Sequence, residues 1–189
     1  MKKLSILIIV LVIGAIAYTL CTSHLHIERT KIGDTSTQIA EIKKLGQWQF
    51  LTAEVEVLVD TVRKRSILIP DDRLARIYRG TMRIGIDLDR TDDSWVTVSG
   101  DTAATVMLPM PRLLDDNFID EANTVAFYQE GVWDAAAKEQ MYRRARSRML
   151  AIGLSEQNMA TARENARARF ASLFRAMGFK HVNVIFSDE

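Results

Sequence analysis

Clustered carboxylates are the residues of this chain whose spacing could support chemistry. Asp87, Asp89, Asp92 and Asp93 lie within seven residues of one another in the stretch GIDLDRTDD. Carboxylates at this density can bind a divalent cation or transfer protons. An EF-hand loop starting at Asp87 would need a glycine at its sixth position and a glutamate at its twelfth, but Asp92 and Val98 stand there. The stretch is better explained as a strand that ends in a turn, because aspartate side chains bond the turn backbone.

Asp87 differs from the other three because it falls inside the strand pattern. It stands between Ile86 and Leu88, which both face the predicted core, and it follows Gly85. A glycine in a strand leaves room for another backbone or side chain to approach closely. We therefore predict that Asp87 is a structural acceptor of hydrogen bonds from a neighbouring loop or arginine, not a catalytic group.

A second acidic group could perform hydrolysis. It contains Asp115, Asp116, Asp120 and Glu121, and paired carboxylates do glycosidase-like work when the pKa of one of them is raised. This group, or Asp87, gives the alternative function: an envelope hydrolase that uses clustered aspartates. No nucleophile elbow, phosphate-binding loop or metalloprotease helix is present. The sequence therefore predicts no catalytic residue, cofactor or metal with a recognisable signature.

The N-terminus places the chain in a cellular context. Lys2 and Lys3 precede an uncharged apolar run from Leu4 to Cys21, which as a helix nearly spans a bilayer. Three interpretations compete: an uncleaved anchor, a secretory signal cleaved after Ala17, and a lipoprotein acylated on Cys21. The apolar run favours the anchor because it continues up to Cys21. The two lysines favour a cytoplasmic N-terminus, so the body is expected on the periplasmic side of the inner membrane.

The segment that follows the anchor could suggest a metal site. His24 and His26 lie close to Cys21, but two histidines and one thiol within the membrane form an incomplete ligand set. Residues 22–35 are therefore predicted to be a juxtamembrane linker, and residues 36–189 a single domain. Cys21 is the only cysteine, so the domain has no internal disulfide.

Alternation of apolar and polar residues predicts the strands of this domain. Residues 49–62 alternate through Ala53, Val55, Val57 and Val59, and residues 76–89 alternate again. Two further strands are predicted in 94–100 and 104–111, and a last one in 181–186. A short helix is predicted over 35–46. The connections 63–73 and 89–104 resemble hairpins, which indicates a mainly antiparallel sheet.

From residue 134 the period becomes helical. Residues 134–153 and 155–178 each carry one apolar stripe and are joined by a short Gly-Leu connection. The fold class predicted is therefore α+β: a mainly antiparallel sheet with a C-terminal two-helix hairpin packed on it, after one N-terminal transmembrane helix.

Charge separates the strand region from the helices. Residues 81–130 contain ten acids and three bases, whereas residues 134–180 contain ten bases and four acids. The helices either pair with the acidic loops or present a basic surface to anionic lipid headgroups or to an acidic partner. The candidate interaction surface consists of Arg143, Arg144, Arg146, Arg148, Arg163 and Arg167. Nucleic acid is not an expected partner for a domain outside the cytoplasm.

The ordered segments LGQWQFLTAE, YRGTMRIGIDL, VMLPMP, FID and GFKHVNVIF resemble an uncharacterised bacterial family of N-terminally membrane-anchored proteins, catalogued only as a domain of unknown function. GIDL at 85–88 and LPMP at 108–111 are its most specific parts. The resemblance covers roughly residues 36–187 and implies an anchor, an extracytoplasmic α+β domain and no assigned activity.

These observations favour a non-enzymatic, membrane-anchored envelope module that contacts protein or lipid. Its expected partners are membrane lipid, through the N-terminal helix, and either another protein or further copies of itself. Self-association would use the helix pair.

Overall fold

The computed structural model describes residues 32–66, 68–100 and 102–187. By its internal contacts the chain divides into residues 1–36 and residues 37–189, and the second unit holds the fold described below. The predicted anchor at 1–21 lies outside the described residues, as does most of the predicted linker at 22–35. Within the described ranges, no helix has the length and apolar character needed to cross a bilayer.

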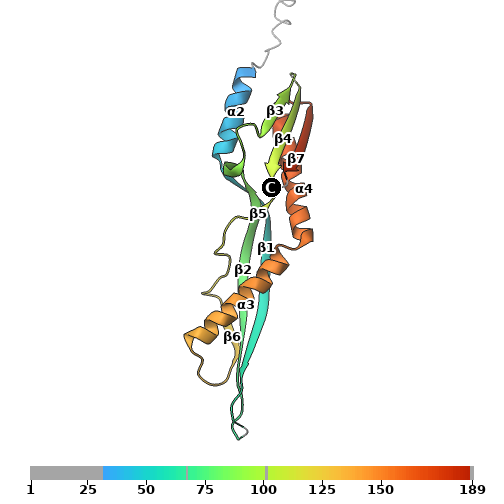
Figure 1. Cartoon of the computed structure of the whole chain (residues 1–189). Coiled ribbons are helices and arrows are strands. Elements are labelled where there is room, and N and C mark those ends of the chain that lie inside the picture. The colour runs from blue at the N-terminus through green and yellow to red at the C-terminus, as the bar shows by residue number, and fades with distance from the viewer. Residues whose placement is uncertain (1–31, 67, 101, 188–189) are drawn as a thin grey trace, which may run out of the picture. The chain divides into compact units, whose positions relative to one another are not determined.

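A long antiparallel hairpin forms the first sheet (Figure 1). Strand β1 (Gln47–Arg63) pairs along its length with β2 (Asp72–Asp87). The other edge of β2 pairs with the short strands β5 (Arg112–Leu113) and β6 (Val125–Gln129). The predicted alternation is confirmed, since Val55, Val57 and Val59 are buried and the residues between them are exposed. The predicted turn after Asp87 is confirmed too, because β2 gives way there to the 3-10 turn η1 (Leu88–Arg90).

A β-bulge at Phe50 changes which face of β1 is buried. Gln49 pairs with Gly85 and Leu51 pairs with Ile84, so Phe50 has no partner in the ladder. An extra residue reverses the side-chain alternation. Before the bulge the even-numbered Trp48 and Phe50 pack inward, and after it the odd-numbered residues do.

The second sheet contains β3 (Val96–Ser99), β4 (Ala103–Pro109) and β7 (His181–Ser187). Strands β3 and β4 form the predicted antiparallel hairpin, but β7 pairs with β4 in parallel along its whole length. A parallel neighbour requires a long crossover, and here the chain between β4 and β7 contains both long helices. The strands are therefore mainly antiparallel, as predicted, but they form two sheets and include one parallel pair.

Two long helices, α3 (Ala135–Gly153) and α4 (Glu156–Ala176), follow the strands, while α2 (Ile32–Lys44) precedes them. The prediction that α3 and α4 form a hairpin is wrong. The chain bends at Leu154 and Ser155 without folding back (Figure 1), and each helix packs on strands instead of along the other. The apolar stripe of α3 faces the β1–β2 hairpin and that of α4 faces β1 and β7.

The described part of the chain accordingly has two hydrophobic clusters. In the first, α4 contributes Phe170 and Phe174 against Ile86 of β2, Trp95 and the second sheet. In the second, the Met141, Ala145 and Met149 stripe of α3 covers the middle of the β1–β2 hairpin. The two clusters adjoin at the bulge, where Phe50 packs against the first cluster and Ala53 against the second. The bulge thus lets one pair of strands serve two helices.

Candidate functional site

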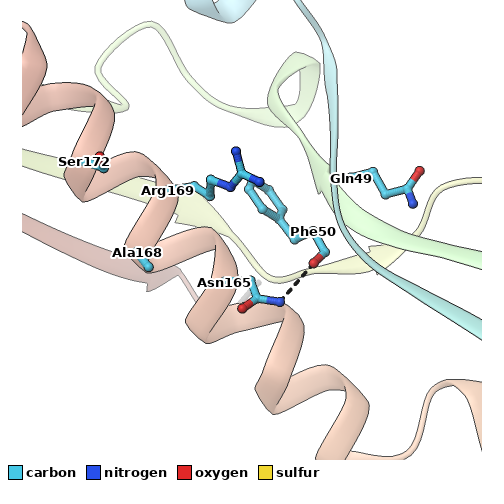
Figure 2. Close-up of a pocket in the computed structure, with 6 residues that line it drawn as sticks. All are labelled: Gln49, Phe50, Asn165, Ala168, Arg169 and Ser172. Carbon is cyan, nitrogen blue, oxygen red and sulfur yellow. Dashed lines mark hydrogen bonds between the residues drawn. The ribbon is translucent and has the colours of Figure 1, made fainter.

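A surface hollow of about 340 Å³ lies between α4 and the bulged part of β1. Figure 2 shows the residues that line it: Gln49, Phe50, Asn165, Ala168, Arg169 and Ser172. The four residues from α4 lie on one face because they are spaced by three or four positions. That face is next to the buried stripe, so these side chains border the strand without entering the core. The hollow is thus built by one helix face and one bulge.

The bulge supplies a backbone acceptor at this hollow. Because Phe50 is outside the ladder, its carbonyl oxygen is open to a side chain, and the Asn165 amide nitrogen donates to it at 3.0 Å (Figure 2). This bond fixes α4 against β1. It also orients the next turn of the helix, which carries Arg169.

Arg169 is the only cation among the residues that line this hollow. Its exposed side chain makes no hydrogen bond or ion pair with any described residue, and in Figure 2 it extends from α4 toward Phe50. A guanidinium presents a planar fork of donors that fits a carboxylate or phosphate in a bidentate way. With the Ser172 hydroxyl on the same helix, the hollow can hold a single anionic group. The Gln49 side chain points away from Arg169 in Figure 2, and its amide nitrogen donates to the Thr52 hydroxyl. The hollow contains no general acid or base.

The arginines predicted as an interaction surface are spread over both helices, and most bind within the molecule. Arg143 pairs with Glu139 at 2.8 Å, one helical turn away. Arg146 contacts Asp116 at 3.4 Å, and its guanidinium lies 5.5 Å from the centre of the Phe118 ring. Internal pairing with the acidic loops, one of the two readings of the charge pattern, is therefore seen for Arg146.

The remaining predicted arginines differ in their surroundings. Arg148 donates to the Leu58 carbonyl of β1 at 3.1 Å. Arg167 pairs with Glu164 on its own helix, and Arg163 buries its Nε without an acceptor among the described residues. Arg144 and Arg163 are both without a hydrogen bond or ion pair in the described part of the chain. The role of these six residues as a contact surface stays a prediction.

Asp87 lies at the end of β2 and bonds locally. Its carboxylate accepts a hydrogen bond from the Asp89 amide at 3.2 Å and caps η1. The Leu88 amide that follows donates to the Gly46 carbonyl at 3.0 Å. Asp87 thus stands where the chain leaves the first sheet, and neither an arginine nor a loop outside η1 donates to its carboxylate among the contacts described.

The acids proposed for hydrolysis do not gather into one site. Asp115 accepts from the Asn117 amide and pairs with Arg83, and these two contacts lower the pKa of its carboxyl group. Asp120 bonds Asn123, which likewise lowers the pKa of Asp120. A catalytic acid needs a raised pKa. Over the described ranges, no group of acids, histidines or cysteines is arranged to hold a metal ion.

Most of the chain is similar in sequence to a known protein family. Residues 40–184 match the family described as "Protein of unknown function (DUF4230)". The chain belongs to the DUF4230 family. No curated protein and no solved structure shows significant similarity to it. The predicted resemblance to a family of unknown function is therefore confirmed, and DUF4230 membership assigns no activity to any residue.

The residues that line the hollow of this DUF4230 domain were not predicted from its sequence. Arg169 is one of many arginines on the two helices, and Gln49, Phe50 and Ser172 carry no chemical motif. A signal was present, however, in the order of residues at the start of β1. Trp48 and Phe50 alternate in one phase and Ala53 and Val55 in the other, which is the pattern that a bulge produces.

Acid sensitivity of the fold should depend on Asp115. Because its contacts lower its pKa in the folded state, the stability that it contributes is present above the unfolded pKa and is lost as the pH falls below it. We expect stability to decline between about pH 5 and pH 2, and Asp115→Asn to flatten that decline. Urea denaturation at a series of pH values measures this, and Arg83→Gln should reproduce part of the effect. An unchanged acid limb in Asp115→Asn would contradict the assignment.

Proposed function

We propose that this DUF4230 protein is a non-enzymatic module of the bacterial cell envelope, held by its N-terminal helix and contacting an anionic partner through the hollow between α4 and β1. The observation that carries the proposal is Arg169. It is an exposed guanidinium without an ion pair in the described part of the chain, and it borders a hollow of about 340 Å³ beside hydroxyl and amide groups. A surface arginine of this kind is available to an external carboxylate or phosphate.

The membrane part of the proposal is supported by the first twenty-one residues alone. Their uncharged run from Leu4 to Cys21 behind two lysines suits an anchor that leaves the body on the periplasmic side. Removing residues 1–21 should then move the protein from the membrane fraction to the soluble fraction. If the full-length chain itself fractionated as a soluble cytoplasmic protein, this part would be wrong.

The proposal that the protein is not an enzyme is supported by the pKa values of its acidic side chains. The carboxyl groups of Asp93, Asp115 and Asp120 all have a lowered pKa because each accepts hydrogen bonds from nearby groups. Such carboxylates are charged at neutral pH and serve as partners for cations and turns. We therefore assign the function to the exposed cations, which can contact a partner.

Site-specific photocrosslinking tests the contact. Ala168 is exposed and lines the hollow, so benzoylphenylalanine placed there in the full-length chain should crosslink to the partner in intact cells. Mass spectrometry of the adduct then distinguishes an anionic lipid from an acidic protein. The same probe at Ala151, an exposed alanine of α3, is the matched control and should give few adducts.

Charge reversal next to the probe decides whether the contact is electrostatic. Arg169→Glu should reduce the Ala168 adducts about tenfold or more, because it replaces a charge-assisted bond with a repulsion. Arg175→Glu changes another exposed arginine of α4 outside the hollow and should reduce them much less. The proposal fails if Ala168 and Ala151 crosslink equally, or if Arg169→Glu leaves the adducts unchanged.

A further inference from the structure

A second hollow, of about 260 Å³, lies where the start of α3 approaches β2. Its walls come from β2, from the segment before β6 and from the first two turns of α3. They consist of Arg76, Tyr78, Glu121, Thr124, Ala135, Lys138, Glu139 and Tyr142. Seven of these side chains end in a charge or a hydroxyl. The hollow is separate from the one that contains Arg169.

The hydroxyl of Tyr78 is a buried donor without a partner. The residue is 1% exposed, and its O–H reaches no acceptor among the described residues. Buried polar groups are nearly always satisfied, so an exception at the wall of a hollow needs a reason. Burial raises the pKa of the Tyr78 phenol, and Arg76 opposes part of this rise through its charge and as a donor toward the phenol oxygen. The phenol therefore stays protonated at neutral pH and able to donate.

Two cations that line this hollow, Arg76 and Lys138, also lack ion pairs among the described residues. The Arg76 guanidinium lies 5.6 Å from the centre of the Tyr78 ring. Neither Arg76 nor Lys138 reaches a carboxylate within the described part of the chain. They line the hollow together with Tyr78 and Tyr142, whose rings pack edge to face at 6.4 Å between their centres. Donors therefore gather on the side of the hollow formed by β2 and α3.

The two glutamates of the hollow are not equivalent. Arg143 pairs with Glu139 at 2.8 Å and neutralises it. Glu121 makes no ion pair among the described residues. The hollow thus contains two uncompensated cations and one uncompensated carboxylate, all on its walls.

We propose that this hollow binds a small zwitterion, an α-amino acid or a short peptide. The ligand carboxylate accepts hydrogen bonds from Tyr78, Arg76 and Lys138, and its ammonium group faces Glu121. The volume is below that of a pocket for a drug-sized molecule, which suits a ligand of this size. The inference is independent of the contact proposed for Arg169, because the two hollows share no residue.

Binding is tested with probes that carry the two charges separately and together. L-Alanine and L-alanyl-L-alanine are zwitterions, acetate has only the carboxylate, and ethylammonium has only the amine. Ligand-detected NMR titration of the full-length chain in mild detergent should give a dissociation constant of about 1 mM or tighter for at least one zwitterion. Acetate should bind about tenfold more weakly and ethylammonium more weakly still. Failure of both zwitterions to bind overturns the proposal.

Variants then assign the roles. Tyr78→Phe should weaken zwitterion binding about tenfold and leave the melting temperature equal or higher, because it removes an unsatisfied buried hydroxyl. Glu121→Gln should weaken binding of L-alanine but not of acetate. Tyr128→Phe, at an exposed tyrosine outside the hollow, is the control and should change neither. Unchanged affinity in Tyr78→Phe would overturn the proposal even if a zwitterion binds.

Discussion

Replacing Gly85 with alanine is expected to destabilise the domain by about 3 kcal/mol or more. A Cβ atom at this position would overlap the carbonyl oxygen of Trp48 and lie 2.8 Å from its carbonyl carbon. It would also lie 2.7 Å from a methyl group of Leu114. The Trp48 carbonyl belongs to the strand next to the bulge and cannot retreat without breaking the pairing of β1 with β2. Urea denaturation of the full-length chain in mild detergent, followed by tryptophan fluorescence, measures the change.

Gly100 provides the matched control for this substitution. It lies in the β3–β4 turn with φ of +62°, and a Cβ there would meet nothing within 4 Å. Gly100→Ala should cost about 1 kcal/mol, through backbone strain alone. A Gly85→Ala variant that is no less stable than Gly100→Ala would mean that β1 and β2 do not approach so closely at the bulge. The hollow beside Phe50 would then lack its structural basis.

The close approach at Gly85 is the kind of feature that sequence can foretell. A glycine inside a strand that otherwise alternates has few explanations, and room for a neighbouring backbone is one of them. The alternation of β1 and β2 was equally readable, because period two is imposed by local geometry and requires only that one face be buried. The identity of the neighbour, Trp48, depends on the register of the hairpin, which no local pattern specifies.

Strand β6 is an element that the local sequence pattern does not predict. All five of its residues, Val125–Gln129, are exposed, so no alternation distinguishes buried from exposed positions. The parallel pairing of β7 with β4 could not be predicted from the sequence either. It depends on where α3 and α4, which lie between the two strands in the chain, place β7. Local pattern predicts that β7 is a strand but is silent about its neighbour.

The two helices were predicted at nearly their observed bounds, yet their arrangement was wrong. The two helices were expected to fold back on each other as a hairpin that packs on one sheet face, because the connection between them is short and both are rich in alanine. The small residues instead allow close contact with strands: a Cβ on Gly153 would overlap the Met82 sulfur. A stripe tells which face of a helix is buried, but not whether a helix or a sheet covers it.

For the candidate sites, too, the local sequence pattern was informative about residue types but not about their partners in the fold. Clusters of like residues attract attention in a sequence, but most of the aspartates and arginines selected in this way bind their own neighbours. Arg169 and Tyr78 matter because of what they lack in the folded chain, an ion pair and a hydrogen bond. Absence of a partner is a property of three-dimensional packing, and composition does not reveal it.

Truncating Phe170 to alanine should be the most damaging change to the α4 half of the domain. Its ring lies 5.3 Å from Trp48, 5.9 Å from Phe50 and 6.1 Å from Trp95, measured between ring centres. The residue is fully buried. Removing a ring from such a site costs about 3–5 kcal/mol, through lost burial and the cavity that remains. Urea denaturation gives the loss in the free energy of unfolding.

Hydrogen exchange can locate the same loss within the fold. Phe170 belongs to the cluster that joins α4 to the second sheet, whereas α3 covers a different cluster. Protection in Phe170→Ala should therefore fall more in α4 and β7 than in α3. Phe127→Ala, at a ring that is 70% exposed on β6, is the control and should change stability by less than about 0.5 kcal/mol. Equal loss of protection in α3 and α4 would show that the two clusters unfold as one unit. The bulge at Phe50 would then couple the two helices instead of separating them, and a ligand held by α3 would stabilise the hollow on α4 as strongly as its own site.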